Sequence, residues 1–161
     1  MPWVKTEDRA RCHPKFFRAG CLSFGWWSAG LGYCNEHLTD GFIATRNLEL
    51  VFPGMLPADR EAAIESLVRE GLVHVVSKGE HPDCHAPLCR RFRAREDGYL
   101  MHDFLVYQPS REHTENVRRV RSEVARKGGV ESGKSRKQIA STTTKQNRSK
   151  PTNSLTRPDP T

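Results

Sequence analysis

The sequence has few apolar residues, and it lacks the long apolar segments of membrane proteins. Apolar residues make up 36% of the 161 positions, against roughly 45–50% in ordinary soluble domains, so part of the chain is expected to lie outside any core. No run of about 18 apolar residues occurs that could span a bilayer. Charged residues also occupy the N-terminus, where a signal peptide would be apolar. We therefore expect a cytoplasmic protein without a membrane partner.

Cysteines are few, and their number is odd. Five cysteines at uneven spacings do not indicate a disulfide framework, which agrees with a reducing compartment. Cys12, Cys21 and Cys34 are interpreted as small buried thiols without a chemical role.

The common motifs of enzymes are also missing. We find no glycine-rich phosphate loop, no paired catalytic carboxylates and no Ser/His/Asp arrangement. The pair His102-Asp103 is typical of some metal-dependent phosphohydrolases, but the further ligands that such a site needs are not present. We interpret the pair as a hydrogen-bonded strand end, and we expect no enzymatic activity.

Acidic residues become scarce in the last third of the chain. Residues 1–110 contain 13 Lys and Arg against 14 Asp and Glu, a net charge of −1, whereas residues 111–161 contain 13 against 5, a net charge of +8. A neutral body with a basic tail indicates an anionic partner, and nucleic acid is favoured over a membrane surface.

The order of the predicted elements is that of a winged helix. Apolar periodicity predicts helices over 21–38, 45–52 and 58–70, and short apolar or β-branched runs predict strands at 41–44, 72–76 and 99–104. The fold class is therefore α+β: a winged helix-turn-helix over residues 1–110, with residues 79–98 as an extended wing loop. A basic helical extension is expected at 111–127, followed by a disordered basic tail at 128–161.

Four stretches resemble a family of small phage and prophage proteins. These are MPWVK, HLTDGFI, HDFLVYQPSRE and the basic RKGGVESGKSRK. The resemblance covers roughly residues 1–130. The resemblance implies a winged-helix DNA-binding protein of the replisome-organiser, or replication-initiation, type. The chain departs from the family in its longer wing and in Val73, where relatives have tryptophan.

Several polar positions are candidates for contact with double-stranded DNA. The third helix offers exposed side chains to the major groove, the preceding helix offers its N-terminus to a phosphate, and the wing and extension offer a run of cations. The candidates are Thr45, Arg46, Asn47, Arg60, Ser66, Arg69, Arg90, Arg91, Arg93, Arg95, Arg118, Arg119, Arg121, Arg126 and Lys127, with Lys134, Arg136 and Lys137 in the tail.

Each of these candidates has a competing structural interpretation. The third helix also contains several carboxylates, so its exposed face is alternatively only a solvated surface. Thr45 is alternatively only the N-cap of its helix. If the arginine run is a strand, all its members except Arg90 share one face. That face, like the tail, is alternatively only a solvated, solubilising surface.

The wing loop contains a cluster of metal-ligand residue types. His81, Cys84, His85 and Cys89 are the residue types that bind tetrahedral zinc, although adjacent Cys84 and His85 need a sharp local turn to bind together. His74 or His102, at the strand edges, is a further possible ligand. The competing interpretation is a loop stiffened by its prolines alone.

Together these features predict a DNA-binding protein of phage replication initiation that recruits host replication proteins. A phage transcriptional regulator on the same fold is an alternative. A winged helix used as a protein-interaction module is a third.

Overall fold

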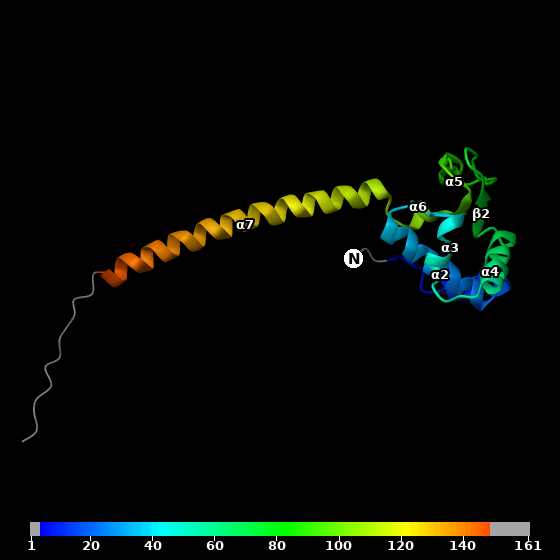
Figure 1. The fold of residues 1–161 in the computed structure, drawn as a ribbon, viewed down its shortest axis with the longest axis horizontal. Coiled ribbons are helices and arrows are strands. Elements are labelled where there is room, and N and C mark those ends of the chain that lie inside the picture. Colours follow the sequence, from blue (N-terminus) through cyan, green and yellow to red (C-terminus); the bar gives the residue numbers. More distant parts are fainter. Residues whose placement is uncertain (1–3, 149–161) are drawn as a thin grey trace, which may run out of the picture. The chain divides into compact units, whose positions relative to one another are not determined.

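In a computed structural model the chain folds into helices and one small sheet (Figure 1). The structure describes residues 4–148, with side chains described at 4–10 and 12–133. The chain divides into two units, one up to Glu115 and one from Asn116 onward. Among the described residues, no helix combines the length and apolar character needed to cross a lipid bilayer.

The elements confirm the predicted α+β class. In chain order they are η1 (Ala10–Cys12), α1 (Pro14–Ala19), α2 (Cys21–His37), β1 (Phe42–Ala44), η2 (Thr45–Asn47), α3 (Leu48–Val51), α4 (Pro57–Arg69), β2 (Val73–Val76), α5 (Pro87–Arg91), β3 (Gly98–Met101), α6 (Phe104–Tyr107) and α7 (Arg111–Arg148).

Helix α4 begins and ends where its sequence signals predict. Pro57 occupies the first turn, where its missing N–H has no helical partner to lose, and Asp59 places a carboxylate near the positive end of the helix dipole. Gly71 follows the helix with φ +64°, the left-handed conformation common just past a helix end. Its inward face buries Ala63, Ile64 and Leu67.

The three strands form one antiparallel sheet in the order β1-β3-β2. Val73 pairs with Met101 and His74 with Leu100, so the two members of each pair point to the same face of the sheet. Val73 and Met101 face the main core, whereas Leu100 belongs to a second apolar cluster. The sheet therefore has two covered faces.

The main core packs α2 and α4 against the first of these faces. Trp26, Leu67 and Ile43 are fully buried there, and each large apolar side chain so buried stabilises the fold by about 1.5–3 kcal/mol. A Cβ at Gly30 would lie 3.3 Å from both the Ile43 side chain and the Met101 sulfur. Glycine at this position thus lets α2 approach the sheet closely.

The second cluster lies between the other face of the sheet and the 77–97 loop. Val76, Cys89, Ala94 and Leu100 are buried in it, and Phe92 stacks on Phe42 with ring centroids 5.2 Å apart. This cluster is small, and it holds the loop that joins β2 to β3.

Three local features differ from the predictions made from the sequence. Of the three cysteines expected to be buried, Cys34 is buried, whereas Cys12 and Cys21 are exposed. The arginine run does not form a strand, because Pro87–Arg91 is the short helix α5, with Arg93 and Arg95 in the irregular segment after it. A proline at the start of α5 fits the first helical turn and explains why this segment turns rather than extends.

The helical extension is also longer than predicted. Helix α7 continues to Arg148, so the predicted disorder of 128–148 is not observed, while residues 149–161 lie outside the described residues. Strong helix formers dominate α7, no proline interrupts it, and its glycines cost only about 1 kcal/mol each. Ion pairs such as Arg111–Glu115 and Arg119–Glu123 connect successive turns.

Candidate metal centre

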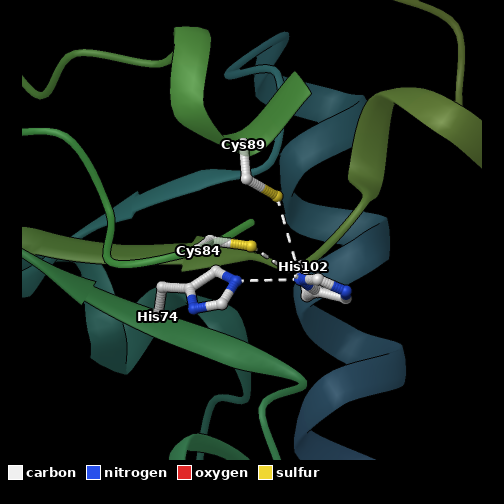
Figure 2. Close-up of side chains that lie close together, drawn as sticks. All are labelled: His74, Cys84, Cys89 and His102. Atoms are coloured by element: carbon white, nitrogen blue, oxygen red, sulfur yellow. Dashed lines mark hydrogen bonds between the residues drawn. The ribbon is translucent and has the colours of Figure 1, made fainter. Parts of the chain in front are cut away.

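Four metal-ligand side chains meet on the sheet face that the 77–97 loop covers. They are His74 from β2, Cys84 from the loop, Cys89 from α5 and His102, the residue after β3. One potential ligand atom from each lies within 4.8 Å of all the others. Figure 2 shows these side chains converging near the ring of His102.

The distances from His102 Nδ1 to the other three ligand atoms are close to those around a tetrahedral ion. His74 Nε2 lies 2.9 Å from His102 Nδ1, while Cys84 Sγ and Cys89 Sγ lie 3.5 and 3.8 Å from the same nitrogen. Zn–N bonds of about 2.0 Å and Zn–S bonds of about 2.3 Å require ligand atoms roughly 3.3–3.8 Å apart. Both sulfurs are at that separation, and the two nitrogens are a few tenths of an ångström closer.

The strand register explains why the two histidines meet. His74 pairs with Leu100, and His102 lies two residues after Leu100. Side chains two residues apart point to the same face, and diagonal neighbours across a strand pair are within reach of long side chains. The His102 N–H continues the pairing by donating to Leu72 O at 3.0 Å.

The two sulfurs are each oriented by a backbone N–H. Ala86 N–H donates to Cys84 Sγ, and Asp103 N–H donates to Cys89 Sγ, both at 3.3 Å. Donors aimed at sulfur favour the thiolate, which is the form that binds a metal.

Asp103 also contacts the outward nitrogen of His102. Its Oδ2 lies 3.2 Å from His102 Nε2, leaving Nδ1 toward the cluster. This carboxylate–histidine arrangement fixes the tautomer and ring orientation of metal ligands. Asp103 reaches both His102 and Cys89 from a left-handed backbone conformation, φ 51°, which aspartate and asparagine adopt more readily than most residues.

The site is partly buried, and burial alters its protonation. Cys89 is buried, while His74, Cys84 and His102 are half-buried. Burial raises the pKa of Cys89 to about 11, partly offset by the Asp103 N–H and reinforced by nearby Cys84. Burial, with the neighbouring His102, lowers the pKa of His74. The neutral imidazole is therefore favoured at His74, and this is the form that coordinates metals. The four side chains together form a group able to hold a metal ion.

The cluster overlaps in part with the ligand set predicted from the sequence, and it includes both histidines named there as further ligands. Cys84 and Cys89 belong to the cluster, but His81 and His85 do not, and His74 and His102 take their places. His81 is exposed, and its Nδ1 lies 2.8 Å from Phe92 O, while His85 is exposed beside Cys84. Cys84 is half-buried in the cluster whereas the adjacent His85 is exposed, so the two side chains do not reach one point.

The candidates on α4 occupy a mainly acidic surface. The Arg60 side chain is only 14% exposed and lies 4.0 Å from Glu49. Arg69 is exposed and donates to Ser66. The other exposed charges of this helix are all carboxylates: Asp59, Glu61 and Glu65.

The candidates before α3 lie against the base of the loop. Thr45 begins a 3₁₀ helix, and both its backbone N–H and its hydroxyl donate to Asp97 O. Arg46 pairs with Glu96 at 3.0 Å. Thr45 is not the N-cap of this turn, because Ala44 occupies that position.

The loop arginines are exposed. Arg90, Arg91, Arg93 and Arg95 all reach solvent, and no ion pair involves them among the residues the structure describes. Arg93 donates to Gly79 O at 2.9 Å, which leaves the remaining N–H groups of its guanidinium free.

The basic candidates on α7 are exposed as well. They are Arg118, Arg119, Arg121, Arg126 and Lys127, of which Arg119 pairs with Glu123. The side chains of Lys134, Arg136 and Lys137 lie outside the described residues.

Comparison with known proteins adds no relative. No protein-family model, no curated protein and no solved structure matches the chain.

Proposed function

We propose that the chain is a winged-helix module that binds double-stranded DNA and carries a structural zinc ion in its wing. In this assignment α2, α3 and α4 are the three helices, β2 and β3 form the hairpin, and the 77–97 loop is the wing. The element order and the sheet order β1-β3-β2 support it.

The observation that carries the DNA assignment is the set of exposed arginines on the wing. Four guanidinium groups within six residues, at positions 90, 91, 93 and 95, have no carboxylate partner among the described residues. Cations of this kind attract the phosphate backbone and release its counterions. Helix α7 adds Arg118, Arg121, Arg126 and Lys127, all exposed.

The surface of α4 is poorly suited to sequence-specific contact in the major groove, so we give such contact a minor role. Its exposed carboxylates would repel phosphates, and Arg60 is largely covered. Arg69 is the one exposed cation on this helix. We therefore assign most of the affinity to the wing and α7, with little discrimination among sequences.

Zinc is the ion that best fits the donor set. Two thiolates and two imidazoles give the Cys₂His₂ combination of structural zinc sites, with four protein ligands and no open position. Harder ions such as Mg²⁺ and Ca²⁺ prefer oxygen ligands, and the cluster contributes none directly.

The biological role that we propose is phage replication initiation, in which the DNA-bound protein recruits host replication proteins. The four stretches that resemble replisome-organiser proteins in sequence support this role. A phage transcriptional regulator is the alternative on the same DNA-binding surface.

A protein-interaction module is a second candidate function, and one observation favours it. Leu50, Phe52 and Leu56, on and beside the α3–α4 turn, are 60%, 42% and 65% exposed next to the acidic face of α4. Apolar side chains bordered by carboxylates suit a basic protein partner better than DNA.

A salt titration of binding to random-sequence duplex DNA tests the proposal. The logarithm of affinity should fall linearly with the logarithm of salt concentration, and the slope should become shallower in the double variant Arg90→Ala/Arg91→Ala. The matched control is Glu61→Gln/Glu65→Gln, which should not weaken binding. No measurable binding by the zinc-loaded protein would refute DNA recognition and leave the protein-interaction module.

A further inference from the structure

We infer that occupancy of the metal centre controls DNA affinity, because the metal fixes the part of the wing that carries Arg90 and Arg91. This inference rests on the proposed DNA-binding function, and it assigns a regulatory role to the metal site. One ion would join four segments, namely β2, the loop at Cys84, α5 and the end of β3. Strands β2 and β3 are already paired in the sheet, so the added connection is that of the loop and α5 to the sheet.

The wing has few other interactions to hold its tip. At its base, Gly79 N–H donates to Ala94 O, Ala94 N–H donates to Glu80 O and Arg93 donates to Gly79 O. The loop contributes Cys84, Ala86, Cys89, Phe92 and Ala94 to the second apolar cluster, and of these Ala94 lies at the base. Two of those five residues are metal ligands, and Phe92 is the only large apolar side chain among them. Without the ion, the segment between the two cysteines is held by the apolar contacts of Ala86 and Cys89 and by the backbone N–H donors to the two sulfurs, and no bond joins Cys84 to Cys89.

The ligands and the DNA candidates are adjacent in the chain. Cys89 lies in α5, and Arg90 and Arg91 are the next two residues and complete that helix. A metal bond to Cys89 therefore anchors the short helix from which both guanidinium groups extend. An ordered pair of cations binds phosphates at a smaller entropic cost than a mobile pair.

The rest of the molecule does not depend on the ion in the same way. The main core contains none of the four ligands. Arg118 and Arg121 lie in the other unit of the chain, on α7. Loss of the ion should thus remove the contribution of the wing to DNA binding while leaving the core folded and the contribution of α7 intact.

A thermodynamic cycle on the full chain tests this inference. Binding to a labelled random-sequence duplex is measured over a salt series, for protein loaded with Zn²⁺ and for protein stripped by a chelator under reducing conditions. In the loaded protein, Arg90→Ala/Arg91→Ala should lower the salt slope by about 1.8, which is about 0.9 for each phosphate that the variant no longer neutralises. In the stripped protein, the same double substitution should change the slope by much less.

The control variant is Arg118→Ala/Arg121→Ala, which should lower the slope equally with and without zinc. The variant Cys84→Ser/Cys89→Ser gives a second route to the metal-free wing and should behave like the stripped protein, whereas Cys21→Ser should behave like the wild type. An equal effect of the wing substitutions in the two metal states would overturn the inference. Global unfolding on stripping, seen as loss of the far-ultraviolet helix signal, would overturn it too. If the loaded wild type fails to bind DNA at all, the proposed function itself is wrong.

Discussion

His74 Nε2 and His102 Nδ1 lie 2.9 Å apart on diagonal positions of neighbouring strands, 28 residues apart in sequence. At this distance the pair shares one hydrogen between two ring nitrogens, and two protonated imidazoles would repel each other. A bound metal ion would take the place of the shared hydrogen, because each ring nitrogen can donate a lone pair to it. This juxtaposition, with two sulfurs beside the same nitrogen, is the basis of the metal centre proposed for this protein.

Asp103 should raise metal affinity without binding the metal. Its carboxylate orients His102, and removing such an outer partner lowers metal affinity by roughly 10–100-fold. Asp103→Ala should show that loss in a zinc competition titration. Asp103→Asn keeps an acceptor for the His102 N–H and tolerates the left-handed backbone, so its loss should be smaller. Equal affinities for all three proteins would contradict the assigned role.

Zinc affinity should rise with pH, because a thiolate and not a thiol binds the metal. The pKa of Cys89 is raised to about 11 by burial, so at neutral pH this residue must lose a proton when the metal binds. Each displaced proton makes apparent affinity rise about tenfold per pH unit below that pKa. His74, whose pKa is lowered by burial, is neutral at pH 7 and adds no proton.

The affinity for zinc measured between pH 6.5 and 8 should therefore have a slope of at least about one logarithmic unit per pH unit. Proton release into a weakly buffered solution should accompany binding. The Cys21→Ser variant provides the control and should share the slope of the wild type. An affinity that does not change with pH would exclude Cys89 as a ligand.

Gly98, the first residue of β3, should not tolerate a side chain. A Cβ at this position would collide with Ile43 O and would lie 2.7 Å from the Phe42 ring. Gly98→Ala should lower the free energy of unfolding by about 1–3 kcal/mol, the usual cost of forcing extra atoms into a packed site. Chemical denaturation measures the change.

Gly25→Ala is the matched control for that experiment. Its Cβ would meet nothing within 4 Å, and alanine in a helix interior is favoured over glycine by roughly 1 kcal/mol. The control should therefore stabilise the protein. If Gly98→Ala did the same, the close packing of β1 against β3 would be incorrect.

Local signals in the sequence predict the longer helices and the three strands, but not the short helices α1, α5 and α6. The boundaries of α4 follow from Pro57, from an apolar stripe that includes Ile64 and Leu67, and from Gly71. Each signal acts within one or two helical turns, so it requires no knowledge of the rest of the fold.

The metal ligands are harder to predict, because half of them depend on strand register. Cys84 and Cys89 are conspicuous in sequence, but nothing local shows that His74 pairs with Leu100 and so lies diagonal to His102. His81 and His85 are nearer in sequence to the cysteines, yet they point elsewhere. A predicted register for the hairpin is the signal that would identify the correct histidines.

The length of α7 is difficult to predict for a different reason. Low apolar content favours disorder, but the segment after Lys127 contains helix formers and no proline before Pro151. Composition alone does not distinguish a solvated helix from a disordered chain, because both lack a core.

Metal content of the purified protein is the most direct test of the central claim. Elemental analysis should find about one zinc per chain, as expected for a single four-ligand site. The zinc should be lost in His74→Ala, Cys84→Ser, Cys89→Ser and His102→Ala, and retained in His81→Ala and His85→Ala. Protein that is purified with reductant and supplied with zinc, yet binds none, would contradict the account, as would a site that disappears with His81 or His85 instead.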